Sequence, residues 1–311
     1  MKLVKAVAPY HHSGFLNFKQ APYEAWKKFG GKVAKAHYPW RFLHGLAYRW
    51  ELPTLWKSKK EARLRFVTPV SMSFDTFPDY VRYEIIPLVW DCWPCYFDKM
   101  CAWMKKNNVQ TAIFTSSQVA TFIKEKFPSM NILAITEGLD EKGYYSSGPI
   151  RYRKYDMLEY GREIDNVVKY SLPDSVKYIH GKVNGKNIFS SQQLYDALAQ
   201  TKIVMSFPKS MTDPEESGGI ETLTQRYWEG MFSGALLVGH APQELVDLLG
   251  YNPVIEADLK NSNAQMMEIL EHLGDYQPLV DRNKEMAMKY GRWEYSMQRI
   301  LSFLQDNEYE V

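Results

Sequence analysis

The chain of 311 residues lacks any long apolar run and has few cysteines. No stretch reaches the roughly 20 apolar residues that a helix needs to cross a bilayer. The first eight residues lack the apolar core of a signal peptide. The three cysteines, Cys92, Cys95 and Cys101, are an odd number in one segment, which argues against a secreted disulfide framework. We therefore expect a cytoplasmic protein.

Short motifs of several enzyme classes are also missing. The sequence contains no G-x-S-x-G, no H-E-x-x-H, no P-loop and no dinucleotide fingerprint. Cys92-Trp-Pro-Cys95 has the spacing of a redox motif, since a helix N-terminus lowers a thiol pKa. A thioredoxin-like unit would be far smaller, however, and a zinc site lacks a fourth ligand. We predict that these cysteines pack in the interior.

The charge of the chain is unevenly distributed. Residues 1–65 carry a net charge of +11 and the remainder −9, although the total is only +2. Aromatic residues are interleaved with these basic ones, a composition that suits an anionic membrane surface, an acidic acceptor or nucleic acid. The alternative is a solvated basic face over an ordinary aromatic core.

Strand-like and helix-like segments alternate in both halves of the chain, which indicates parallel sheets covered by helices on both faces. Glycine, serine and proline concentrate between Asp140 and Lys154, which predicts a domain boundary there. The expected strands are 3–8, 84–91, 111–115, 131–135, 156–160, 176–179, 202–207, 235–239 and 253–256. The expected helices are 22–29, 96–107, 117–127, 162–170, 191–200, 243–249, 263–273 and, with a break near Gly291, 280–304. Residues 37–60 are irregular and remain unassigned.

The segment Ser217–Gly239 reads as a glycine turn, a helix and a buried strand. Glycines such as Gly219 allow a ligand to approach the backbone closely, and Thr224 suits a helix start. Free N–H groups at that start favour an anion. Glu221 and Glu229 are eight residues apart, so they would project from nearly the same face if both were helical.

Four segments carry a family resemblance. They are Thr224-Gln-Arg226-Tyr-Trp-Glu229-Gly-Met-Phe-Ser-Gly234 with the strand after it, Ile135–Asp140, Tyr160-Gly161-Arg162 and Tyr290–Arg299. In their order along the chain they resemble segments of GT-B nucleotide-sugar glycosyltransferases of the group-1 type, in particular the spore-maturation-like branch. The spacing of Glu221 and Glu229 resembles the E-x7-E motif of retaining members. The resemblance covers roughly residues 84–304.

This resemblance implies an α/β fold in which two Rossmann-like domains face each other across a cleft. Residues 1–145 would form the acceptor-binding domain and residues 146–288 the domain that binds the nucleotide sugar. Residues 289–311 would form a C-terminal helix that crosses back to the first domain.

The resemblance also implies roles for individual residues in binding the donor. Glu229 would bind the ribose hydroxyls, Arg226 and Arg162 the diphosphate, and Glu221 the sugar. The family's Glu-Gly-Phe-Gly loop is Glu221-Thr-Leu-Thr here, so Glu221 could instead supply charge at a helix N-terminus. The remaining donor-binding candidates are Thr224, Gly219 and Lys169.

Two residues of the first half are candidates for the catalytic base. Asp91 stands at the carboxyl end of an expected strand and would act if the enzyme inverts the anomeric centre. His12 follows the first expected strand and ranks behind Asp91. A retaining enzyme needs neither as a base.

The sequence contains no Asp-x-Asp motif, through which many sugar transferases hold the donor pyrophosphate with a metal. We therefore expect no metal and no cofactor besides the nucleotide-sugar co-substrate, with arginines and helix N-termini offsetting the phosphate charge. The expected activity is a hexosyltransferase-like transfer to a hydroxyl of a glycan or lipid-linked acceptor in surface polysaccharide synthesis. Residues 1–65 would hold the protein at the inner face of the membrane.

Two alternatives remain open. One is a non-catalytic protein of the same fold that binds nucleotides or carbohydrates. The other is a protein that acts on or binds nucleic acid through its basic first 65 residues, and this partner ranks behind the glycan and the lipid.

Overall fold

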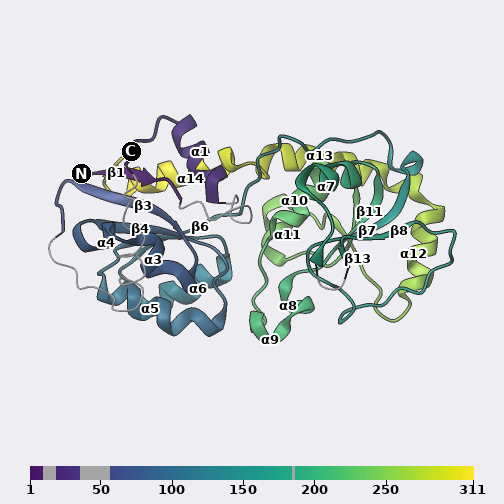
Figure 1. Ribbon diagram of the computed structural model, residues 1–311, viewed down its shortest axis with the longest axis horizontal. Helices are drawn as coiled ribbons and strands as arrows, with labels where there is room; N and C mark the ends of the chain where they lie inside the picture. The colour runs from purple at the N-terminus through teal and green to yellow at the C-terminus, as the bar shows by residue number, and fades with distance from the viewer. Residues whose placement is uncertain (10–18, 36–56, 184–185) are drawn as a thin grey trace. The chain divides into compact units, whose positions relative to one another are not determined.

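The computed structural model describes residues 1–9, 19–35, 57–183 and 186–311. The chain forms two compact units (Figure 1). The first comprises Met1–Thr136 together with Trp293–Val311, and the second comprises Glu137–Arg292. The sequence placed the corresponding boundaries after residues 145 and 288. His12 and most of the unassigned aromatic segment lie outside the described residues.

The first unit is built on a parallel sheet with the strand order β14-β1-β3-β4-β5-β6, and β2 also pairs with β1. Its strands are β1 (Lys2–Val7), β2 (Val33–Ala34), β3 (Glu61–Val67), β4 (Glu84–Val89), β5 (Thr111–Phe114), β6 (Asn131–Ala134) and β14 (Tyr309–Glu310). Its helices are α1 (Gln20–Lys28), α3 (Met72–Thr76), α4 (Asp79–Arg82), α5 (Phe97–Lys106), α6 (Ser117–Lys126) and α14 (Trp293–Asp306).

The alternation of side chains along β3 gives this sheet two different faces. Leu64 and Phe66 point into an apolar core that also contains residues of α1 and α14, and these two helices lie side by side (Figure 1). Arg63 and Arg65 are buried on the other face, where both pair with Asp79 of α4, at 3.9 and 3.0 Å. The last helix of the chain therefore completes the core of the first unit.

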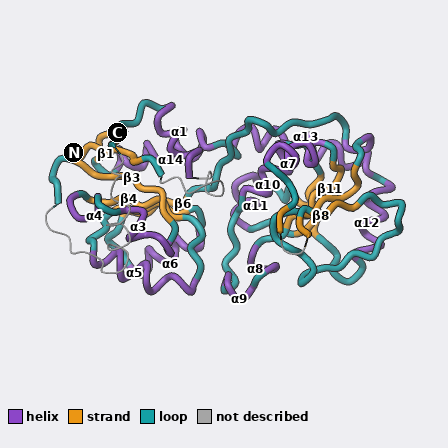
Figure 2. Tube along the Cα trace, viewed as in Figure 1, coloured by secondary structure: helices purple, strands orange, loops and turns teal. Residues whose placement is uncertain are grey.

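The second unit contains a five-stranded parallel sheet in the order β13-β12-β11-β7-β8, and a separate antiparallel pair, β9 and β10. Figure 2 draws the strands of this sheet in orange, with β8 and β11 labelled. Its strands are β7 (Tyr155–Glu159), β8 (Tyr178–His180), β9 (Lys182–Val183), β10 (Lys186–Asn187), β11 (Thr201–Ser206), β12 (Leu236–Gly239) and β13 (Val254–Glu256). Its helices are α7 (Ser191–Ala199), α8 (Lys209–Thr212), α9 (Pro214–Ser217), α10 (Gln225–Phe232), α11 (Gln243–Leu249), α12 (Ser262–Glu271) and α13 (Gln277–Tyr290). Short 3-10 helices occur at Pro69–Ser71, Pro94–Tyr96, Ile150–Tyr152 and Leu273–Tyr276.

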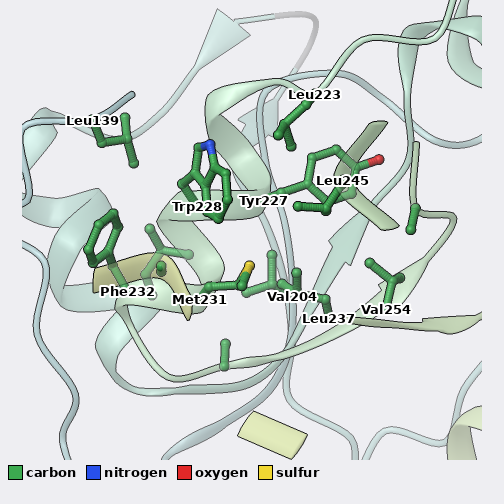
Figure 3. Close-up of a cluster of buried hydrophobic side chains, with 14 of the residues drawn as sticks. Leu139, Val204, Leu223, Tyr227, Trp228, Met231, Phe232, Leu237, Leu245 and Val254 are labelled. Atoms are coloured by element: carbon green, nitrogen blue, oxygen red, sulfur yellow. The ribbon is translucent and has the colours of Figure 1, made fainter. Parts of the chain in front are cut away.

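Both faces of the second sheet are buried. Val204 and Leu237 point to one face and pack with Trp228 and Tyr227 of α10 (Figure 3). Their strand neighbours, including Ile203 and Leu236, belong to a second apolar cluster with residues of α12 and α13. Apolar layers on both faces are expected of a parallel sheet, so the sequence-based expectation of covered parallel sheets is confirmed.

The structure corrects two local expectations. Residues 162–170 do not form a helix; apart from a bend at its start, the segment is irregular with a single turn at residues 165–167. Ile164 and Val168 are nevertheless buried as their helical spacing suggested, and one turn is closed by a hydrogen bond from the Val168 N–H to the Ile164 carbonyl, at 2.9 Å. Glu221 precedes α10, so it does not share a helical face with Glu229. The expected break near Gly291 is confirmed, because α13 ends there.

Candidate functional site

Arg226 and Gly161 meet at the start of α10, although 65 positions separate them in the sequence. Gly161 follows β7 with a φ of +78°, a conformation that favours glycine. A Cβ atom at this position would overlap the Nη2 atom of Arg226. The guanidinium also lies over the ring of Tyr160, with Cζ 5.5 Å from its centroid.

Arg226 is half-buried and forms no ion pair with any carboxylate that the structure describes. Its Nε atom is shielded from solvent and has no hydrogen-bond acceptor within that part of the chain. A shielded N–H group of a guanidinium that has no acceptor is energetically costly. The position is therefore suited to an anionic ligand that supplies one.

Buried Tyr227 lies within the electrostatic influence of several charged side chains. Burial raises the pKa of its hydroxyl, and the nearby guanidiniums of Arg226 and Arg162 oppose that rise while the carboxylates of Glu221 and Glu256 add to it. These four charged groups therefore lie around one hydroxyl. Three of them, Arg226, Arg162 and Glu221, were expected from the sequence, and Glu256 was not.

Glu221 is held by a histidine that follows β12. The Nε2 atom of His240 lies 3.4 Å from a Glu221 oxygen, and its Nδ1 atom lies 2.7 Å from an oxygen of Glu256. Glu256 ends β13, so the neighbouring ends of β12 and β13 bring His240 and Glu256 together, and the loop before α10 adds Glu221. Nothing in the sequence pairs His240 with either glutamate, because the contact depends on strand order in the sheet.

Glu229 receives two hydroxyl hydrogen bonds. Tyr144 donates to its Oε1 atom at 2.8 Å, and Tyr160 donates to its Oε2 atom at 2.7 Å. Burial first, and the Glu229 carboxylate second, raise the pKa of both tyrosines, so both hydroxyls keep their protons near neutral pH. Tyr160 thus touches both residues of α10 that the sequence singled out, Glu229 through its hydroxyl and Arg226 through its ring.

A pocket of about 350 Å³ opens beside this cluster, at the carboxyl ends of β7 and β8. Its volume is at the lower end of the range for small-ligand sites. Buried Glu159 lies at its edge and accepts hydrogen bonds from the Ile164 N–H at 3.0 Å and the Tyr178 hydroxyl at 2.7 Å. The lining residues are Glu159, Tyr160, Gly161, Arg162, Glu163, Asp165, His180, Gly181 and Lys182.

The remaining predicted site residues are placed as follows. Thr224 is the N-cap residue of α10, although its side chain makes no capping hydrogen bond. Gly219 has a φ of +80° with open space around it, so it is suited to a left-handed turn and not to a crowded contact. Lys169 is exposed between β7 and β8. Asp91 belongs to the first unit, where it is exposed after β4 with a φ of 48°.

Of the three cysteines predicted to pack in the interior, Cys92 is buried, Cys101 is half-buried and Cys95 is exposed. All three are free, and Cys92 is buried with its Sγ atom 3.4 Å from the sulfur of Met100. Burial raises the pKa of the Cys92 thiol, which opposes the thiolate that redox chemistry needs.

Much of the basic character of residues 1–65 is neutralised locally within the described ranges. Seven of these residues form ion pairs with carboxylates. The pairs are Lys2–Glu84, Lys5–Glu61, Lys19–Asp75, Lys27–Glu24, Lys28–Glu294, Arg63–Glu61 and Arg65–Asp79.

Within the described ranges, no helix is long and apolar enough to cross a bilayer. No group of three or more His, Cys, Asp or Glu residues there is arranged to hold a metal ion.

Several solved structures match the architecture of this chain over nearly its whole length. Sucrose-phosphate synthase from Thermosynechococcus elongatus matches with a TM-score of 0.59 at 10% identity, over 98% of this chain and 99% of that one. Anabaena Alr3699/HepE in complex with UDP and glucose matches with a TM-score of 0.59 at 10% identity, over 97% and 99%. AviGT4, a glycosyltransferase involved in avilamycin A biosynthesis, matches with a TM-score of 0.55 at 13% identity, over 97% of each chain.

The sequence itself matches no family model and no curated protein sequence. At 10–13% identity the structural likeness shows the fold, a mixed α/β architecture of the GT-B type with two parallel sheets. A shared fold does not imply a shared activity, so a function has to be argued from the site.

Proposed function

We propose that this protein is a metal-independent glycosyltransferase that moves a sugar from a nucleoside-diphosphate sugar to a hydroxyl acceptor. The observation that carries the proposal is Arg226, a half-buried guanidinium without an ion pair within the described residues, at the start of α10 and close to Arg162. Guanidiniums and helix N-termini are both suited to binding a diphosphate. The GT-B fold and the segments that resemble this family support the same reading.

In this proposal, the donor is bound by the second unit. Arg226 and Arg162 hold the diphosphate, and Thr224 places the free N–H groups of α10 toward it. Glu229 accepts hydrogen bonds from the ribose hydroxyls. The backbone at Gly219 and the exposed Lys169 are secondary donor contacts.

Catalysis would come from stabilising the charge that develops on the leaving diphosphate and from orienting the acceptor. Glu221, held by His240, would bind the transferred sugar in a retaining reaction, for which its spacing from Glu229 is the support. In an inverting reaction Asp91, and behind it His12, is the candidate base. Stereochemical analysis of the product distinguishes the two outcomes.

The acceptor we propose is a glycan or lipid-linked hydroxyl in surface polysaccharide synthesis, bound mainly by the first unit. Association with an anionic membrane surface through residues 1–65 is part of this proposal. The ion pairs described above lower the net positive charge that residues 1–65 can present to an anionic surface. Binding to anionic vesicles at low salt tests this part separately.

The proposal is tested with a panel of nucleotide sugars in the presence of a chelator, by thermal shift and by donor hydrolysis. We expect one nucleoside-diphosphate sugar to stabilise the protein and to be hydrolysed slowly without metal. Glu229→Ala should abolish turnover while leaving the unfolding temperature within a few degrees of wild type. Binding without hydrolysis or transfer would favour the non-catalytic binding protein, and near-normal turnover of Glu229→Ala would contradict the assigned site.

A further inference from the structure

The hydrogen bonds of Glu229 are divided evenly between its two carboxylate oxygens. Tyr144 donates to one oxygen and Tyr160 to the other, at 2.8 and 2.7 Å. An ionised carboxylate has about four acceptor positions, two on each oxygen. Each Glu229 oxygen therefore keeps one acceptor position for another donor.

Packing holds both tyrosines firmly in place. Tyr160 is 8% exposed, and its ring lies beneath the guanidinium of Arg226. The Tyr144 ring packs edge-on against Tyr195, with centroids 4.6 Å apart, and stacks on Phe232, with centroids 6.3 Å apart. Both hydroxyls keep their protons, so each donates to Glu229; the other acceptor near the Tyr160 hydroxyl, the Arg226 carbonyl, is farther away, at 3.4 Å.

We infer that Tyr144 and Tyr160 are positioning residues that orient Glu229 to receive two neighbouring hydroxyls, the 2′ and 3′ hydroxyls of a ribose. The inference rests on the proposed function and adds the way in which the sugar of the nucleoside is recognised. One free acceptor position on each carboxylate oxygen matches two donors on adjacent carbons. A nucleotide lacking these hydroxyls leaves both positions unused.

Tyr160 also joins the two halves of the donor site. Its hydroxyl fixes Glu229, and its ring lies against Arg226, which stands three residues earlier on α10 and therefore on the same helical face. The carboxylate for the ribose and the cation for the diphosphate are thus set at a constant separation. A nucleoside diphosphate, in which ribose and diphosphate are adjacent, fits such a pair.

A plainer role for both tyrosines is to satisfy a partly buried carboxylate without any ligand. The two roles differ in what removal of a hydroxyl does to ligand selectivity. If the hydroxyls orient Glu229, their loss weakens binding of a ribonucleotide and leaves binding of the deoxy form unchanged. If they only stabilise the fold, both nucleotides are affected equally.

The test is isothermal titration of wild type, Tyr160→Phe and Tyr144→Phe with UDP or GDP, whichever raises the wild-type unfolding temperature, and with its 2′-deoxy and 2′,3′-dideoxy forms. We expect wild type to prefer the ribonucleotide over the dideoxynucleotide by at least about ten-fold, the low end of the selectivity that one hydrogen bond to a charged group provides. Each variant should lower this preference at least three-fold while binding the dideoxy form as wild type does. Both variants keep the ring, so the apolar packing is preserved.

The matched control is Tyr145→Phe. Tyr145 is adjacent to Tyr144 and also donates its hydroxyl to a carboxylate, that of Asp196 at 2.9 Å, but on the exposed surface. The control should keep the wild-type preference. An unchanged preference in both test variants overturns the positioning role alone. The proposed function is overturned separately, if wild type binds no member of the nucleotide-sugar panel.

Discussion

The substitution Gly161→Ala should have two separate effects. It strains the backbone, which lowers stability, and it displaces the Arg226 guanidinium, which weakens ligand binding. The φ of +78° costs an alanine about 1–2 kcal/mol. The added Cβ would overlap Nη2, the far end of the flexible Arg226 side chain. Moving that end costs little, so the free energy of unfolding should fall only by the strain. A charge-assisted hydrogen bond lost from a ligand is worth about 1.5–3 kcal/mol, so nucleoside-diphosphate affinity should fall about 10- to 150-fold.

The control for this change is Gly250→Ala. Gly250 has a similar φ of +73° at the end of α11, and a Cβ there would meet nothing within 4 Å. Denaturant unfolding should give the two variants the same loss of stability within about 0.5 kcal/mol. Titration calorimetry should show weakened binding for Gly161→Ala only. Wild-type affinity in Gly161→Ala would refute the reasoning that this glycine gives Arg226 its position.

Three further outcomes follow from the structure. The pKa of Glu61 is lowered, chiefly by its hydrogen bond from Lys5. Its contribution to stability is therefore present above about pH 4.3 and is lost as the pH falls through the folded-state pKa, so Glu61→Gln should flatten the acid side of the stability profile. In thiol labelling of the native protein, exposed Cys95 should react readily and buried Cys92 only after unfolding. Leu237→Ala should cost about 2–5 kcal/mol of unfolding free energy, because Leu237 is fully buried beneath α10, and a smaller loss in a denaturant titration would mean that the helix collapses onto the sheet.

The sequence predicted most strands and helices because their apolar periodicity is local. It was wrong about residues 162–170, where Ile164 and Val168 have helical spacing. In the folded protein the Glu159 carboxylate accepts the Ile164 N–H at 3.0 Å. A single turn at residues 165–167 and the irregular backbone around it bury the same side chains as a helix would, so the pattern identified the buried residues and not the backbone that carries them.

The candidate site was only partly predictable, for a related reason. Arg226 and Glu229 were found because they occupy one helix in a recognisable order. Tyr144 and His240 were missed as partners of the site glutamates, since they reach Glu229 and Glu221 only through tertiary contacts. No local pattern marks such partners, because their meeting depends on which strands are neighbours in the sheet.

The return of the chain into the first unit has a consequence for synthesis on the ribosome. Trp293, Met297 and Ile300 of α14 lie in the core of that unit at 2% exposure or less, and β14 pairs with β1. The first unit is synthesised first, but its core cannot be completed until α14 and β14 have left the exit tunnel of the ribosome. The second unit is contiguous in sequence, and a hydrogen bond of 2.7 Å from the Leu139 N–H to the Gly291 carbonyl ties its two ends together. It can therefore fold while translation continues, and a premature stop in α14 would release a finished second unit attached to an open first one.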